Sequence, residues 1–498
     1  MRRVGTRRRR AGGIALGLVA LVLPACSAQG SGSDAAPRAT TTRPDADGSA
    51  PGGSTTTTEP PRTDVDPSVE DVPDEVFDGL GDPRIDVRHE EVEVTADPGQ
   101  AGISGRAVLT LTATTADPLP SFTLDLRGPE VDELTVDGTA AEVDAGPDQI
   151  AVTPATPLEP GVEVEVAVSY SGTPDPTAFP GLGVPVGWQA DDAGGWFTMS
   201  EPDGTATWVP VNDHPSDKAT WTVSLDTPAD AVGVSNGRLV SSDTDGERRL
   251  WVWETDRPMA SYLVLAAIGA YDLVRQDGTD GRKLAFAFAP QVEEADRRGF
   301  ERTDEILSFL AEQFGPYPDD DAGVIVVDSS VGLALETQTR PLFGLDGVDA
   351  EALAHELAHQ WFGDDVSPAS WADLWLNESF ATYADWLWAE HDLGADLRDL
   401  ADAPYVFSEG GLAVTDPRAA ATFDGVIYQG GARALLALRL TIGDAPFAEI
   451  LRRWVQQYGG GTATTADFTA LAEQVSGEDL DAFFVAWLRS PTQPDLPG

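Results

Sequence analysis

Hydrophobic and polar positions change their spacing part-way along this chain. From about residue 84 to 272, short runs rich in Val, Thr, Leu and Trp are separated by turn residues, as in 107–113, 162–168 and 221–225. Alternation with a period of two is typical of half-buried strands. This region therefore predicts an antiparallel β-sandwich-like domain, with expected bounds 76–272.

The pattern after about residue 293 has the period of a helix instead. Apolar residues recur at helical spacing, and Gly and Pro separate the segments, as at Gly315-Pro316 and Asp416-Pro417. The expected helices cover residues 293–314, 349–361, 378–390, 429–440, 444–457 and 465–475. Strands followed by helices predict an α+β protein whose second domain, 273–498, is mainly α-helical.

The start of the chain has the layout of a secretion signal. Six arginines precede a short apolar run from Ile14 to Leu23, shorter than the about 20 residues of a membrane-spanning helix. The run ends in Leu23-Pro24-Ala25-Cys26, which resembles a bacterial lipobox and implies cleavage before Cys26 and lipid on its sulfur. We expect a signal peptide at 1–26 and a lipoprotein on the outer face of the cell membrane, with plain secretion as the alternative.

A low-complexity segment follows the expected signal. Residues 27–75 contain almost no aromatic or large aliphatic side chains and consist largely of Thr, Ser, Gly, Pro and Asp. Such a segment buries too little apolar area to offset the entropy lost on ordering. We expect a disordered tether that holds the folded part away from the lipid surface.

Charge and cysteine content exclude several classes of protein. With 83 acidic and 32 basic residues, the chain carries a net charge of −51. Nucleic acid repels such a chain, because phosphate binding requires clustered Lys and Arg. The acidic surface keeps the protein soluble, and adaptation to salty surroundings is the alternative interpretation. The single cysteine excludes a disulfide framework and a cysteine-based zinc site.

The strongest chemical signal is the motif His355-Glu356-Leu357-Ala358-His359. Two histidines four residues apart lie on one helix face, about 5–6 Å apart at Cβ, so both imidazoles can reach one ion. No Gly or Pro interrupts residues 350–361, so a helix can run through the motif. A catalytic zinc site needs three protein ligands plus water. We expect His355, His359 and Glu378, on the next predicted helix, to hold one Zn²⁺ ion.

Neighbouring residues complete the expected chemistry of a hydrolase. Glu356 follows a ligand by one position and therefore projects beside the metal, where it can accept a proton from water and later deliver it to a leaving amine. Ligand imidazoles normally donate their other nitrogen to a carboxylate or a carbonyl. By proximity in sequence, Asp373 and Thr382 are the candidates for that supporting role.

These residues stand in a longer run that resembles a known family. His355-Glu-Leu-Ala-His-Gln-Trp-Phe-Gly363, followed by Trp375-Leu-Asn-Glu378, is similar to the gluzincin metallopeptidases of the aminopeptidase N type, which also include leukotriene hydrolase. Further family-like stretches, in the same order, are Pro210-Val-Asn-Asp-His-Pro215 with Asp217-Lys218, Ser235-Asn-Gly237, Met259-Ala-Ser-Tyr-Leu263 and Phe314-Gly-Pro-Tyr-Pro318. The resemblance covers most of residues 84 to 490. It implies a thermolysin-like catalytic domain and a zinc aminopeptidase acting on peptides with a free N-terminus.

The resemblance also nominates residues that contact the substrate. The family donates a hydrogen bond to the oxyanion from a tyrosine in a Tyr-x-x-Gly-Ala setting, which matches Tyr428-Gln-Gly-Gly-Ala432. It binds the substrate amine with a Glu in a Gly-Ala-Met-Glu-Asn segment. The matching segment, Leu333-Ala-Leu-Glu-Thr337, nominates Glu336, although Gly has become Leu333 and Asn has become Thr337. A Gln that the family places before Val209-Pro210 is absent, and Glu201 is the candidate substitute, with a surface turn as the alternative.

Two other functions stay open at this point. The same zinc site can serve an endopeptidase or a nonpeptide hydrolase, and blocking the substrate's amino group would distinguish these from an aminopeptidase. A lipid-tethered binding or scaffold protein with an idle metal site belongs to a different class. The intact set of Glu356, Tyr428 and both motif histidines argues against the idle site, which has no reason to keep a base and an oxyanion donor.

Overall fold

The computed structural model describes residues 74, 76–77, 79–178, 185–329, 334–345, 350–405, 411–418 and 421–498. The expected signal peptide at 1–26, with its lipobox, and the expected tether at 27–75, apart from Asp74, lie outside the described residues. In the described part of the chain, no helix is both long and apolar enough to cross a bilayer.

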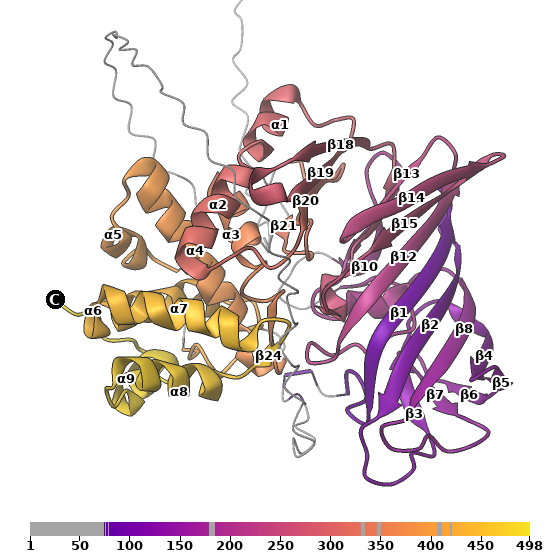
Figure 1. Cartoon of the computed structure of the whole chain (residues 1–498), viewed down its shortest axis with the longest axis horizontal. Coiled ribbons are helices and arrows are strands. Elements are labelled where there is room, and N and C mark those ends of the chain that lie inside the picture. Colours follow the sequence, from indigo (N-terminus) through magenta and orange to yellow (C-terminus); the bar gives the residue numbers. More distant parts are fainter. Residues whose placement is uncertain are drawn as a thin grey trace, which may run out of the picture. The chain divides into compact units, whose positions relative to one another are not determined.

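A large twisted sheet forms most of the N-terminal part (Figure 1). Its strand order is β14-β15-β12-β1-β2-β8-β4-β5, with β16 paired to β12. The strands are β1 (Ile85–Ala96), β2 (Ile103–Ala113), β4 (Glu130–Val136), β5 (Thr139–Ala140), β8 (Glu163–Gly172), β12 (Lys218–Pro228), β14 (Arg238–Asp245), β15 (Arg248–Glu254) and β16 (Met259–Ala260). The predicted strands at 107–113, 162–168 and 221–225 lie in β2, β8 and β12.

Alternating burial explains why these segments form strands. In β8, Val164, Val166, Val168 and Tyr170 are buried, while the residues between them are exposed or half-buried. A period-two pattern of this kind places one face of the strand against the core. The expected antiparallel pairing is wrong at one position, because β1 and β12 pair in parallel.

Two smaller sheets complete the β-rich part. One has the order β3-β7-β6 and the other β13-β17-β11-β10-β9. Their strands are β3 (Phe122–Asp125), β6 (Glu142–Ala145), β7 (Gln149–Thr153), β9 (Thr177–Ala178), β10 (Pro185–Ala190), β11 (Trp196–Met199), β13 (Val232–Ser235) and β17 (Ala266–Gly269), accompanied by the 3₁₀ turns η1 (Gly204–Thr207) and η2 (Ser261–Leu263).

The second part begins with a mixed sheet that the helical pattern did not predict. Its order is β18-β19-β20-β22-β21, and β19 pairs with β20 in parallel. The strands are β18 (Asp272–Asp277), β19 (Lys283–Phe288), β20 (Asp321–Val326), β21 (Ala334–Leu335) and β22 (Leu342–Phe343), with the short turn η3 (Thr279–Gly281) between β18 and β19 and a separate parallel pair, β23 (Val366–Pro368) and β24 (Gly461–Ala463).

Helices form the rest of this part (Figure 1). They are α1 (Glu294–Phe300), α2 (Thr303–Phe314), α3 (Ala350–Ala358), η4 (Trp371–Asp373), α4 (Trp375–Leu393), α5 (Leu397–Ala401), the π-helical turn η6 (Val426–Gly430), α6 (Gly431–Ile442), α7 (Asp444–Tyr458), α8 (Thr465–Ser476) and α9 (Asp481–Leu488). The predicted helix at 293–314 is two helices, and α5 and α9 were not predicted. The other helices agree with the ranges predicted from the sequence. The β-rich part and the helical part together confirm the predicted α+β fold class.

Side chains link the N-terminal β-rich part to the part that begins with β18 by donating to backbone carbonyls. Lys218 on β12 is half-buried, and its Nζ donates to the carbonyls of Asp364, Asp365 and Gly461 at 2.7, 2.9 and 3.3 Å. In the opposite direction, the buried guanidinium of Arg340 donates to the carbonyls of Ser235 and Gly237. These bonds fix the backbone that follows the histidine motif and the backbone that follows Glu336.

One buried carboxyl group of the β-rich part makes its stability depend on pH. Asp213 is 1% exposed and accepts a hydrogen bond from the Ser261 hydroxyl at 2.6 Å. Burial, with the charge of Asp125 adding to it, raises the pKa of Asp213 to about 8. The stability that this group contributes is therefore fully present below the ordinary carboxyl pKa and is lost as the pH rises through about 8.

We expect Asp213→Asn to flatten this dependence, because Asn keeps an acceptor for Ser261 and carries no charge. Thermal melts from about pH 6 to 9 measure the effect as the change in midpoint with pH. Asp243→Asn, which removes an exposed carboxylate on β14, is the matched control. The same pH dependence in both variants would contradict the assignment to Asp213.

Candidate metal centre

Two consecutive helices bring the three expected metal ligands together. His355 lies in the last turn of α3, His359 directly follows that helix, and Glu378 lies in the first turn of α4. One ligand atom from each lies within 4.8 Å of the others. Glu378 Oε2 is 3.4 Å from His355 Nε2 and 3.5 Å from His359 Nε2. The i, i+4 spacing of the histidines thus places both imidazoles opposite one carboxylate.

The second nitrogen of each imidazole faces a separate partner. His359 Nδ1 donates to the carbonyl of Phe362 at 3.1 Å, and His355 Nδ1 is 3.5 Å from Asp385 Oδ2. Nδ1 is thereby oriented away from the site and Nε2 into it, as in metal-bound histidines.

The sequence-based expectation for these supporting partners was wrong. Asp373 accepts instead from the backbone and hydroxyl of Thr465 at 2.9 and 2.6 Å. The partner of His355 is Asp385 rather than Thr382. Asp385 follows Glu378 by seven residues, and that spacing of two helical turns is the signal that could have identified it.

The donor set fits a zinc ion. Two neutral imidazole nitrogens and one carboxylate are a set that catalytic zinc sites use. Glu378 is 3% exposed, and no hydrogen-bond donor among the described residues reaches its Oε2. A buried carboxylate oxygen without a donor needs a positive partner. Although burial opposes it, the charge of a protonated His359 holds the pKa of Glu378 below its usual range.

Glu356 and Tyr428 lie beside the three ligand atoms. Glu356 is 4% exposed, and its carboxylate groups with Glu336 and His359 within 4.8 Å. Burial raises the pKa of Glu356 above that of an ordinary carboxyl group, toward the range of a general base. The ring of Tyr428 stacks on His355 with centroids 6.2 Å apart. Burial, followed by the neighbouring Glu378, raises the pKa of Tyr428, so its hydroxyl keeps its proton and can donate.

Glu336 and Glu201 form the other side of the site. Glu336 follows β21, Glu201 follows β11, and their carboxylates group with Glu378 within 4.8 Å. Both are buried, and neither Glu336 Oε1 nor Glu201 Oε1 has a hydrogen-bond donor in the described structure. Gln360, next to the ligand His359, donates from Nε2 to the backbone carbonyl of Glu336 at 3.2 Å and thereby holds the strand end against the metal helix. The seven residues that the sequence nominated as metal ligands, catalytic groups or substrate contacts therefore lie in one cluster.

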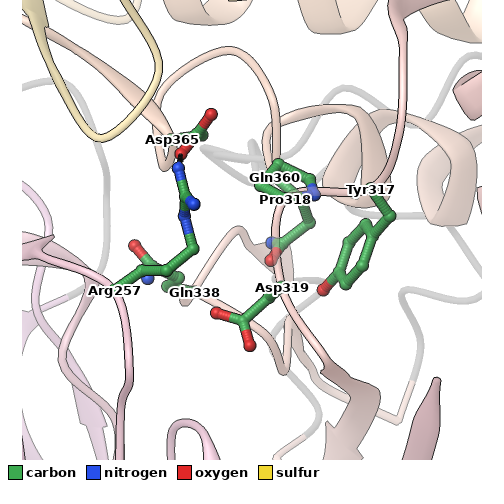
Figure 2. Close-up of a pocket in the computed structure, with 7 residues that line it drawn as sticks. All are labelled: Arg257, Tyr317, Pro318, Asp319, Gln338, Gln360 and Asp365. Atoms are coloured by element: carbon green, nitrogen blue, oxygen red, sulfur yellow. Dashed lines mark hydrogen bonds and ion pairs between the residues drawn. The ribbon is translucent and has the colours of Figure 1, made fainter. Parts of the chain in front are cut away.

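A small cavity adjoins this cluster but is too small for a substrate. Figure 2 shows its lining: Arg257, Tyr317, Pro318, Asp319, Gln338, Gln360 and Asp365. Arg257 points toward Asp365, with which it forms an ion pair. The cavity volume of about 10 Å³ is enough for one water molecule. We therefore assign it no substrate.

A β-rich part followed by helices that join two histidines and a glutamate is the architecture of the two-domain zinc metallopeptidases. Two family models match the chain: the Peptidase M1 N-terminal domain over residues 88–263 and the Peptidase family M1 domain over residues 347–487. The M1 zinc metallopeptidase from Deinococcus radiodurans has a similar structure, with a TM-score of 0.78 and 33% identity over 85% of this chain and 99% of that chain. A mutant of it, bound to a Tyr-Ser-Ala substrate, has the same TM-score and coverage at 32% identity. The chain belongs to peptidase family M1, as the sequence resemblance implied.

Curated relatives are longer than this chain. Aminopeptidase M1-A of Oryza sativa subsp. japonica is 26% identical over 324 residues, which cover 60% of this chain and 37% of the relative. Glutamyl aminopeptidase of Homo sapiens is 27% identical over 331 residues, which cover 60% of this chain and 34% of the relative. The matched region thus spans little more than a third of these relatives.

Proposed function

We propose that this chain is a zinc-dependent aminopeptidase that hydrolyses the first peptide bond of peptides with a free amino terminus. The observation that carries the proposal is the pair of buried carboxylate oxygens, Glu201 Oε1 and Glu336 Oε1, which lack a donor among the described residues. An ammonium group supplies both positive charge and three donors, so it satisfies such a pair. The aminopeptidase names of the M1 relatives support the same activity.

In this proposal His355, His359 and Glu378 hold the zinc ion. When bound, zinc polarises the scissile carbonyl and makes a water molecule acidic enough to attack near neutral pH. Glu356 accepts the proton of the attacking water and returns it to the leaving amine. The Tyr428 hydroxyl donates a hydrogen bond to the oxygen on which negative charge develops. Glu336 and Glu201 bind the substrate's amino group, so the first peptide bond of the substrate is the one that lies beside Glu356 and Tyr428.

Removal of the Glu336 charge tests the amine anchor. For Glu336→Gln we expect kcat/KM on free aminoacyl amides to fall by about two orders of magnitude, because a buried charge loses its partner. The slow turnover of the same amides with blocked amino groups should stay unchanged. Parallel steady-state assays on the two substrate series, with and without a chelator, measure both effects.

Glu201→Gln is the matched variant for this test. It should have a smaller effect, because the resembling family places a Gln at the corresponding place. Equal cleavage of free and blocked substrates by the unmodified enzyme would replace the proposal with an endopeptidase. No turnover despite bound zinc would favour the binding or scaffold protein.

We also propose that the chain is exported and attached to the outer face of the cell membrane through lipid on Cys26. The basic start, the short apolar run and the position of the single cysteine support this proposal. In a bacterial host, labelled fatty acid should be incorporated into the full chain and not into Cys26→Ser. Equal labelling of both would exclude Cys26, and release of the full chain into the medium would favour plain secretion.

A further inference from the structure

Tyr428 lies in an unusual backbone conformation. The turn η6 is π-helical and leads directly into α6. The backbone N–H of Gly431 donates to the carbonyl of Val426, five residues earlier. A π turn is wider than an α turn, and such turns are rare and occur mostly at functional sites. The carbonyls of a π turn do not all take part in the i→i+4 hydrogen bonds of an α-helix, so donors from elsewhere in the chain are needed to stabilise the turn.

Two side chains from distant parts of the chain donate to carbonyls of this turn. The Ser379 hydroxyl donates to the carbonyl of Ile427 at 2.5 Å, across 48 positions of sequence. Gln493 Nε2 donates to the carbonyl of Gly430 at 2.7 Å, across 63 positions. The two accepting carbonyls belong to Ile427, directly before Tyr428, and to Gly430, two positions after it. The turn is therefore held on both sides of the tyrosine.

The Ser379 contact requires a glycine opposite it. A Cβ atom at Gly431 would lie 1.7 Å from the Ser379 hydroxyl oxygen, so a side chain there is incompatible with this approach. Ser379 itself directly follows Glu378 on α4. The hydrogen bond thus links the helix that carries the metal-facing carboxylate to the turn that carries the tyrosine.

The Gln493 contact is equally specific. Its Nε2 also donates to the carbonyl of Trp487 at 2.9 Å, and its Oε1 accepts from the Tyr405 hydroxyl at 2.7 Å. Arg433, on the first turn of α6, donates to the carbonyl of Pro494. The segment after α9 is therefore fixed, and it presents the Gln493 amide to the turn in one orientation.

We propose that Ser379 and Gln493 are positioning residues that hold the Tyr428 hydroxyl at the metal centre by fixing the π turn from two sides. The proposal rests on the role given to Tyr428 in the proposed function. Without either bond, a buried or half-buried carbonyl loses its donor, and the turn can relax toward the tighter α form. Tyr428 then leaves its place beside His355 and Glu378, while the metal ligands and the amine anchor are unaffected.

The test uses the zinc-loaded full chain with Ser379→Ala and Gln493→Glu. Glu keeps the size of Gln493 and the acceptor for Tyr405 but loses the donor that serves the carbonyls of Gly430 and Trp487. With KM and zinc content unchanged, we expect kcat on aminoacyl amides to fall by about tenfold in Ser379→Ala, the scale of one lost hydrogen bond, and by at least as much in Gln493→Glu. Gln456→Glu, at an exposed position on α7, is the charge-matched control and should be neutral.

A binding measurement separates positioning from general damage. A phosphinic dipeptide analogue, whose anionic oxygens imitate the tetrahedral state, should bind each variant more weakly by the same factor. A simple alkylamine, which reaches the amine anchor and has no oxygen for Tyr428, should bind as tightly as before. In a Tyr428→Phe background, neither substitution should lower kcat further, because the hydroxyl that they position is gone.

The outcomes distinguish the two proposals. Equal losses of kcat in the Tyr428 and Phe backgrounds, or a lower melting temperature with kcat and phosphinate affinity unchanged, would overturn the positioning role. If Tyr428→Phe by itself leaves kcat and phosphinate affinity intact, the role of Tyr428 fails instead. Should Ser379→Ala not fold, Gln493→Glu decides alone, since it acts from outside the metal helices.

Discussion

Glu356→Gln should lower kcat by about 10²–10⁴-fold while the protein keeps its zinc. Gln has the size of Glu, so the packing around this 4% exposed side chain is preserved. What is lost is the ability to accept a proton. Steady-state rates on free aminoacyl amides, with zinc content measured on the same preparation, separate lost proton transfer from lost metal.

The control for this substitution is Glu390→Gln. Glu390 is exposed on α4, so the variant makes the same change in charge at a distance from the site. It should leave kcat unchanged. Retention of a tenth or more of the kcat in Glu356→Gln would show that another group moves the proton, and the assignment of Glu356 would be wrong.

Glu378→Ala should have its largest effect on zinc affinity. The substitution removes one of three protein ligands and leaves two imidazoles, so we expect the affinity to fall by more than about 100-fold. Competition against a fluorescent chelator measures this quantity directly. The rise in melting temperature that zinc gives the unsubstituted protein should also disappear, because ligand stabilisation depends on affinity.

Asp385→Ala is the graded comparison for the same measurement. Asp385 faces His355 Nδ1 at 3.5 Å rather than the metal position, so its loss should weaken zinc binding by only about 10–100-fold. Equal affinities for Glu378→Ala and the unsubstituted protein would refute Glu378 as a ligand. A larger effect of Asp385→Ala than of Glu378→Ala would reverse their assigned roles.

Local patterns predicted the centre of the site because its geometry is local. His355 and His359 are neighbours on one helix face, and Glu378 follows on the next helix. The spacing rules of a single helix therefore place most of the donor set. Asp385 was within reach of the same rule but was missed, because proximity in sequence was used in place of helical spacing. Glu336 and Glu201 required the family resemblance, since they come from separate strands.

Contacts between distant segments were beyond sequence patterns. The parallel pairing of β1 with β12 joins residues about 130 positions apart, such as His89 and Thr220. Nothing in the alternation of either strand specifies its partner, because that choice depends on the packing of the whole sheet. The same holds for Ser379 and Gln493, whose roles appear only when the carbonyls of the π turn are seen to lie beside them.

The buried guanidinium of Arg340 has a consequence for recombination between relatives. It is held by the carbonyls of Ser235 and Gly237, and Asn236 donates to the carbonyl of Gln338 at 2.7 Å. The backbone that carries Glu336 is thus shaped by the connection between β13 and β14, which is encoded a hundred residues earlier. A chimera that joins this catalytic half to a foreign β-rich half must also inherit a matching connection. Otherwise the buried guanidinium keeps only the carbonyl of Ala285, 3.4 Å from its Nε, as an acceptor, and we expect such a chimera to be less stable.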